Sequence, residues 1–124
     1  MKNLNRIELQ GNVGNVKPLS GTTLNGIALS VATNLYYKDD KQQGGYGCDT
    51  TWHDVVAWEG NGIAPLDKIT KGVAVHVVGR LRKRAYKDAE GHTRYATEVL
   101  AHILDIIDNG DATAKEEIDP ERIF

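Results

Sequence analysis

Residues 73–101, VAVHVVGRLRKRAYKDAEGHTRYATEVLA, decide how the rest of the chain is interpreted. Valine recurs at alternate positions over residues 73–77, which is the period-two pattern of a β-strand with one buried face. Gly79 interrupts this pattern, and a glycine inside a strand indicates a bulge or a sharp bend. Residues 87–91 supply a turn, and residues 94–101 form a returning strand. The segment therefore predicts one long β-hairpin that bends at Gly79.

Basic side chains alternate along the hairpin after the bend. Arg80, Arg82, Arg84 and Tyr86 occupy alternate positions, so an extended strand places them on one face. Arginine makes bidentate contacts with phosphate, and an aromatic ring offers a surface on which a base can stack. The pattern fits a nucleic-acid-binding face. A row of solvated charges without a ligand is the alternative that this stretch alone leaves open.

The composition indicates one ordinary globular domain. The chain has 124 residues, of which 40% are hydrophobic and 26% are charged. No run approaches the ~18 apolar residues of a membrane span, and the first residues lack the apolar core of a secretory signal. A single cysteine, Cys48, allows no internal disulfide and suits a reducing compartment. We therefore expect a cytoplasmic protein without a membrane partner.

Acidic residues are concentrated at the end of the chain. Residues 105–124 hold seven acidic and two basic side chains, a net charge of −5, whereas residues 1–104 carry +3. From residue 109 onward there is almost nothing apolar to bury, which is typical of a disordered segment. The sequence thus predicts a folded domain over residues 1–108 and a flexible acidic tail over residues 109–124.

The remaining elements complete an all-β pattern. Strands are predicted at residues 6–11, at residues 27–32 with a continuation to 36–37, and at residues 51–58, with loops at residues 11–21 and 38–49. Ile63, Leu66 and Ile69 recur every third residue, which predicts one short helix with Gly72 near its C-terminal end. Five strands with a helix after the third is the order of the oligonucleotide/oligosaccharide-binding (OB) barrel, whose face binds single strands.

The sequence resembles the bacterial single-stranded DNA-binding protein family, including its phage- and plasmid-borne members. The matching pieces follow the family's order, and they are RIELQGNVG at 6–14, AT at 32–33, TWHDVV at 51–56, KG at 71–72, VGRLRKR at 78–84 and RYATEV at 94–99. The resemblance implies an OB-fold subunit, usually a homotetramer, that binds single-stranded DNA without sequence preference. It also implies roles in DNA replication, recombination and repair, and a location at the nucleoid.

The resemblance further implies a set of binding residues. The aromatic positions at which the family stacks bases correspond to Tyr37, with Tyr36 beside it, and to Trp52, Trp58 and Tyr86. We expect the phosphates to be neutralised by Arg80, Arg82, Arg84, Lys87 and Lys38. His53 corresponds to a position near a subunit contact. The alternatives are that the two tryptophans are core residues and that His53 is a hydrogen-bonded core histidine.

Several positions depart from the family pattern. Asp54 lies between the two tryptophans, where a basic residue is common, and tyrosine replaces the more usual tryptophan at Tyr37 and Tyr86. The acidic end resembles the family's partner-binding tip, although Arg122 stands where proline is usual. The tip residues, expected to bind replication and repair proteins, are Asp119, Glu121, Ile123 and Phe124. A chain terminus without a role is the alternative.

Catalysis is not indicated. The four histidines lack metal-ligand spacing, and the sequence contains neither a phosphate-binding glycine loop of the P-loop pattern nor a recognisable serine or cysteine nucleophile. We therefore expect a binding protein without a metal or cofactor. The alternative within the binding class is an accessory OB-fold factor similar to primosomal protein B, which is typically dimeric and lacks an acidic tail.

Overall fold

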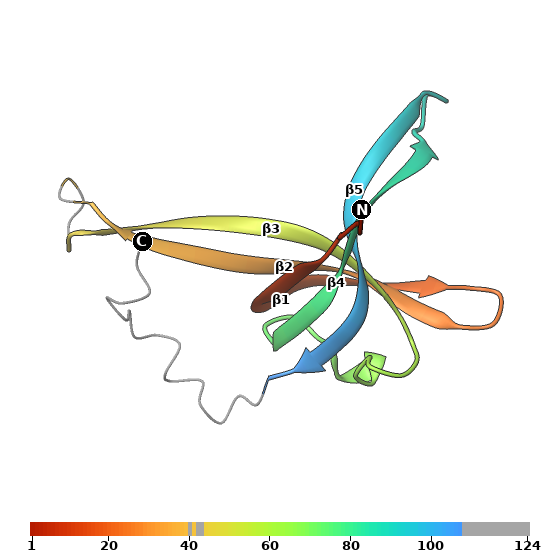
Figure 1. The fold of residues 1–124 in the computed structure, drawn as a ribbon, viewed down its shortest axis with the longest axis horizontal. Helices are drawn as coiled ribbons and strands as arrows, with labels where there is room; N and C mark the ends of the chain where they lie inside the picture. The colour runs from red at the N-terminus through yellow and green to blue at the C-terminus, as the bar shows by residue number, and fades with distance from the viewer. Residues whose placement is uncertain (40, 42–43, 108–124) are drawn as a thin grey trace.

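The computed structural model describes residues 1–39, 41 and 44–107, and these form a closed five-stranded barrel (Figure 1). The strands are β1 (Ile7–Ser20), β2 (Asn25–Lys38), β3 (Tyr46–Trp58), β4 (Ala74–Lys87) and β5 (Thr93–Ile106). Their order around the barrel is β1-β2-β3-β5-β4, and only the β3–β5 pairing is parallel. The predicted all-β OB barrel is confirmed. The predicted tail, residues 109–124, lies outside the described residues.

The core is built from the alternate residues that the sequence pattern placed on inward faces. Val31, Val55, Val75, Val77 and Leu104 are fully buried inside the barrel. Burying an aliphatic side chain of this size stabilises the folded state by roughly 1.5–3 kcal/mol. The predicted inward face of the stretch that begins at Val73 is therefore correct.

The bend at Gly79 is a β-bulge. Val78 pairs with Ile103 and Gly79 pairs with Ala101, which leaves His102 as an extra residue on β5. A Cβ atom at Gly79 would lie 2.2 Å from the carbonyl oxygen of Leu100. Only glycine at this position therefore allows β4 and β5 to approach each other so closely. The prediction of a bulge at Gly79 is confirmed.

The β2–β3 and β4–β5 hairpins extend beyond the barrel as arms (Figure 1). The β2–β3 arm consists of residues 33–38 paired with residues 46–51, in a register that runs without a shift from the barrel to the end of the arm. The β4–β5 arm consists of residues 82–87 paired with residues 93–98. Because neither arm contains a bulge, side chains alternate strictly between the two faces of each arm.

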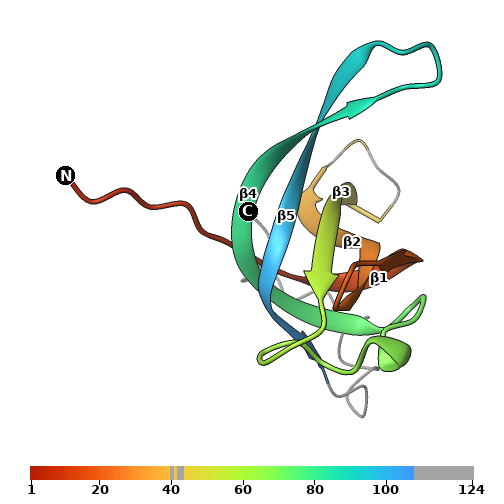
Figure 2. The same cartoon turned by 90° about the vertical axis from the view of Figure 1, so that its right-hand side faces the viewer.

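An extended N-terminal segment precedes β1 and leads away from the barrel (Figure 2). Within it, the Asn5 side-chain amide donates to the carbonyl oxygen of Leu81 at 2.8 Å and its oxygen accepts from the Leu81 N–H at 3.0 Å. β4 pairs with β1 only as far as Gly79. Asn5 therefore satisfies the backbone of β4 just where the pairing with β1 ends.

Three predicted boundaries were wrong because strand pairing continues beyond the residues that the sequence pattern assigned to strands. β1 runs to Ser20 instead of ending at Gly11, with a register shift between Val13 and Val16. Pro18 is tolerated because this half of β1 pairs only with β2, so the missing N–H faces no partner. β3 begins at Tyr46 and β5 continues to Ile106.

The predicted short helix is a single 3₁₀ turn, η1 (Leu66–Lys68). Ile63 forms an isolated bridge with Leu104, and Ile69 is buried in the core. The spacing of three residues thus reflects apolar anchors that hold a connection against the barrel rather than an α-helical face. Gly72 is not a helix cap and lies in the turn before β4, where its N–H donates to the Val13 carbonyl. None of the described helices is long and apolar enough to cross a membrane.

Candidate nucleic-acid interface

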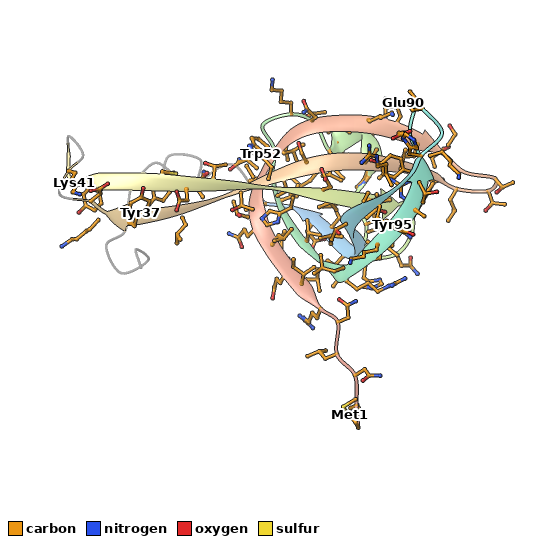
Figure 3. All side chains as sticks on the ribbon, turned by 90° about the horizontal axis from the view of Figure 1, so that it is seen from above. Met1, Tyr37, Lys41, Trp52, Glu90 and Tyr95 are labelled. Atoms are coloured by element: carbon orange, nitrogen blue, oxygen red, sulfur yellow. The ribbon has the colours of Figure 1, made fainter. Side chains whose placement is uncertain are left out.

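The unbroken register of β2 and β3 assigns each aromatic side chain to a face. Even-numbered residues of both strands point out of the barrel, because Val31 and Val55 at odd positions point in. Trp52 and Trp58 therefore share the outer face with Tyr36. Tyr37 lies on the opposite face of the β2–β3 arm, farther out than Trp52 and toward the tip at Lys41 (Figure 3).

The rings of Trp52, Trp58 and Tyr37 each lie against a glycine. A Cβ atom at Gly14 would come within 2.4 Å of the Trp52 ring, and one at Gly26 within 2.6 Å of the Trp58 ring. A Cβ atom at Gly47 would lie 2.4 Å from the Tyr37 ring. The missing side chains let these rings pack close to the backbone.

Neither tryptophan belongs to the core. The Trp52 side chain is 59% exposed, and Trp58 is half-buried at the edge of a groove. Tyr86 on the β4–β5 arm is 43% exposed. Tyr36 and Tyr37 are half-buried. The alternative that both tryptophans are core residues is therefore wrong, and their role in base stacking stays a prediction.

The groove joins the outer face of β3 to the β4–β5 arm. It has a volume of about 690 Å³, and its lining includes Asp54, Trp58, Arg82, Arg84 and Glu98. One large ring and two guanidinium groups thus line the same concave surface. A base and its neighbouring phosphate carry the two kinds of group that such a surface accepts.

Glu98 organises the two arginines of this groove. It is 4% exposed and lies directly across from Arg82 in the hairpin. Its Oε2 accepts a hydrogen bond from Nε of Arg82 at 2.8 Å and forms an ion pair with Nη2 of the same guanidinium at 2.7 Å. Its Oε1 accepts a hydrogen bond from Nε of Arg84 at 3.3 Å. The Arg84 guanidinium also lies 5.8 Å from the centre of the Tyr86 ring. A buried carboxylate is tolerated only when it is paired in this way.

The other predicted phosphate ligands are more scattered. Arg80 is exposed and makes no ion pair with any residue in the described part of the chain. The Lys87 ammonium donates to the Thr93 hydroxyl at 3.1 Å. Lys38 lies at the end of β2, on the other arm. The structure thus gathers Arg82 and Arg84 with Trp58 and Tyr86, but it places Lys38 elsewhere.

Sequence reasoning missed Glu98 and Tyr95. The signal for Glu98 was available, since a hairpin with its turn at residues 88–92 places residue 98 across from Arg82. Tyr95 is 69% exposed and pairs with Ala85, so it lies on the face of the β4–β5 arm opposite Tyr86.

His53 is half-buried, with its Nε2 2.9 Å from the Thr33 hydroxyl oxygen. The structure contains one chain, so a role for His53 at a subunit contact stays a prediction. Among the residues that the structure describes, no group of three or more histidine, cysteine, aspartate or glutamate side chains could hold a metal ion.

A hydrogen-bonded carboxylate shapes the tip of the β4–β5 arm. Oδ1 of Asp88 accepts from the backbone N–H groups of Glu90 and His92, both at 2.9 Å. Its Oδ2 accepts from Nε of Arg94 at 2.9 Å. The hydrogen bond from Arg94, followed by those from the backbone, lowers the pKa of Asp88 below its ordinary value. Arg94 pairs with Tyr86, so this turn also fixes the strand that carries the ring.

Comparisons with known proteins agree with this geometry. The model of the single-strand binding protein family matches residues 4–107. The chain belongs to this family. It is 34% identical over 110 residues to single-stranded DNA-binding protein 1 of Xylella fastidiosa (strain 9a5c), covering 86% of this chain and 79% of the relative. The resemblance inferred from the sequence is therefore confirmed, and the family consists of binding proteins rather than enzymes.

Two solved structures share the fold. A Plasmodium falciparum SSB in complex with single-stranded DNA has a TM-score of 0.64 and 28% identity, covering 87% of this chain and 98% of that one. A deletion mutant of the Thermus aquaticus single-stranded DNA-binding protein also has a TM-score of 0.64, at 23% identity. This match covers 85% of the present chain and 51% of the Thermus chain, and it supports the fold alone.

The Asp88 turn predicts a specific titration behaviour. Its lowered pKa means that the ionised carboxylate stabilises the folded hairpin above the ordinary aspartate pKa of about 3.9, and that this stability is lost as the pH falls through the lowered value. Carboxyl-carbon NMR titration should give an Asp88 pKa below the ordinary value. Arg94→Gln should raise it, whereas Arg6→Gln, a distant control, should not. An unchanged pKa in Arg94→Gln would assign the shift to the backbone donors alone.

Proposed function

We propose that this protein binds single-stranded DNA without sequence preference, along the outer face of β2 and β3 and the groove that leads to the β4–β5 arm. The observation that carries the proposal is that the exposed Trp52 shares its face with Trp58. Trp58 in turn lines a groove that contains two guanidinium groups. Membership of the single-strand binding protein family supports it, as does the similarity to an SSB structure described as a complex with single-stranded DNA.

Base stacking supplies the sequence-independent part of this binding. Every base has a flat π-surface, so a ring such as Trp52 accepts any of the four without reading hydrogen bonds at the base edges. The glycines beneath Trp52 and Trp58 hold the rings in place before the DNA arrives, so less motion is lost on binding. Phosphate contacts from exposed arginines add affinity that depends on salt.

We further propose that the protein protects single strands during DNA replication, recombination and repair, at the nucleoid in the cytoplasm, and that it acts as a homotetramer. The family membership supports these roles. In this proposal His53, which pairs with Val31 just before the β2–β3 arm begins, lies near a subunit contact.

The stacking proposal predicts an effect of each tryptophan. Trp52→Ala and Trp58→Ala should each weaken the binding of oligo(dT) by about 1–3 kcal/mol, the usual contribution of one base–aromatic stack. Quenching of the remaining tryptophan fluorescence, or fluorescence anisotropy of labelled oligo(dT), measures the affinity. Oligo(dT) of increasing length should then report the number of nucleotides covered.

Tyr95→Ala is the matched control for these variants. Tyr95 is more exposed than Trp52, but it lies on the opposite face of the β4–β5 arm from Tyr86. Its replacement should leave the affinity unchanged. Two tryptophan variants that fold normally and bind as tightly as the parent protein would show that the binding face lies elsewhere.

The phosphate contacts predict a salt effect that depends on the face of the strand. The logarithm of the binding constant should fall with the logarithm of the salt concentration, and Arg80→Gln should make this slope shallower by roughly 0.7 for one lost contact. Lys83→Gln removes the same charge from the opposite face of β4, where Lys83 pairs with Thr97, and should leave the slope unchanged. Equal effects of the two variants would indicate a diffuse charge effect instead of a contact at Arg80.

The acidic segment supports a second kind of contact, with proteins. Residues 109–124 combine Asp119 and Glu121 with the apolar Ile123 and Phe124, a composition that suits a basic groove with an apolar pocket. Removing residues 121–124 should preserve folding and oligo(dT) affinity while abolishing the recruitment of replication and repair enzymes. Affinity capture from host extract with both chains measures this. Identical sets of captured enzymes would show that the tip recruits nothing.

A further inference from the structure

Glu98 is the one buried charged side chain in the part of the chain that the structure describes, and it lies in the proposed DNA-binding groove. A carboxylate near a phosphate-binding surface repels the ligand, so its presence there needs an explanation. It lies on β5 directly across from Arg82 and diagonally from Arg84, on the outward face of the hairpin. Both arginines reach back to it across the hairpin.

The contacts leave part of each guanidinium free. A guanidinium has five N–H donors. Arg82 directs its Nε and Nη2 to one oxygen of Glu98, whereas Arg84 directs only its Nε to the other oxygen. The side chains of Arg82 and Arg84 are 30% and 51% exposed. The remaining donors are therefore available in a groove that Trp58 also lines.

We propose that Glu98 is a positioning residue for DNA binding, which holds Arg82 and Arg84 in the orientation that meets phosphates beside the bases stacked on Trp58 and Tyr86. This inference rests on the proposed function and specifies how its charged groups are arranged. A free arginine loses considerable rotamer freedom when it binds a phosphate, whereas an arginine already held by a carboxylate loses less. Glu98 thus neutralises one positive charge but orients two guanidinium groups.

The arrangement also connects the arginines to a stacking ring. Arg84 lies between Glu98, which accepts from its Nε, and the Tyr86 ring, whose centre is 5.8 Å from the guanidinium carbon. An attraction of this kind between a cation and a ring favours the stacked geometry. The buried carboxylate of Glu98 therefore orients Arg84, and Arg84 in turn favours one orientation of the exposed Tyr86 ring.

Asp54 provides a matched control, because it carries the same charge in the same groove without this role. It is exposed and makes no ion pair or side-chain hydrogen bond with the described residues. Glu98→Gln and Asp54→Asn each remove one negative charge with little change in shape. If only the net charge of the groove mattered, both would tighten DNA binding.

The two variants should change the affinity in opposite directions. Asp54→Asn should tighten oligo(dT) binding about two- to fivefold at low salt, because one repulsive charge is gone. Glu98→Gln keeps one acceptor oxygen and turns an N–H₂ group toward the second arginine, so it should weaken binding about tenfold in spite of the added positive charge. Binding is measured with oligo(dT), and thermal unfolding confirms that both variants fold.

A spectroscopic measurement separates positioning from general stability. In the unsubstituted protein, the Nε–H groups of Arg82 and Arg84 should give sharp, slowly exchanging ¹⁵N NMR signals that persist when oligo(dT) is added. Glu98→Gln should broaden or remove at least one of them. If this variant does not fold, the Nε–H signals of the unsubstituted protein with and without oligo(dT) still test the proposal. Loss of both signals on DNA binding would mean that DNA displaces Glu98, and the inference would be overturned.

The outcomes also distinguish this inference from the proposed function. Failure of the unsubstituted protein to bind oligo(dT) would contradict single-strand binding itself. Normal binding by the unsubstituted protein, together with tighter binding by a folded Glu98→Gln, would leave single-strand binding intact and overturn only the positioning role.

Discussion

The β4–β5 hairpin has to close the barrel at its base and leave the barrel at its tip, and the bulge at Gly79 allows it to do both. Closure rests on a short parallel contact in which Val55 and Val56 of β3 pair with Val99 and Leu100 of β5. The extra residue, His102, shifts the inward parity of β5 from Leu104 to Ala101 and Val99. Beyond this point the hairpin keeps an inward face for the core and an outward face for Arg82 and Glu98.

Net charge is a poor guide to the partner of this protein. The chain carries −2 overall, and the groove itself contains Asp54 and Glu98 beside its two arginines. In the proposed binding mode, a polyanion is favoured by the direction of the donors and by exposed rings on which bases can stack whatever the total charge. Stacking is little affected by salt, whereas phosphate contacts are screened. A groove with a modest net charge therefore relies on well-placed donors more than on long-range attraction.

The sequence predicted those features that depend on neighbouring residues along the chain. Alternating valines identified the inward faces, and Gly79 identified the bulge, because both signals are local. The length of β1 could not be read in this way, since residues 14–20 favour a loop and become a strand only through pairing with β2. Likewise, the apolar residues at 63, 66 and 69 have a spacing that predicts a helix. The spacing instead reflects separate contacts of this connection with the barrel. The proposed role of Glu98 depends on the register between β4 and β5. This register can be predicted from the sequence only when the position of the turn between the two strands is known.

The position of Tyr37 follows from the same dependence on register. The resemblance seen in the sequence implies a stacking role for Tyr37, but alternation along β2 places Tyr36, not Tyr37, on the face of Trp52. The β2–β3 arm is two strands wide, and neighbouring strands lie about 4.8 Å apart. A DNA strand that passes from Trp52 along the outer face therefore meets Tyr36 first and reaches Tyr37 only by crossing the edge of the arm. With Gly47 beneath the Tyr37 ring, that second face is also prepared for a flat ligand. In the proposed binding mode, the path of the DNA at this arm therefore depends on which edge of the arm it crosses, and such a path can contact both tyrosines.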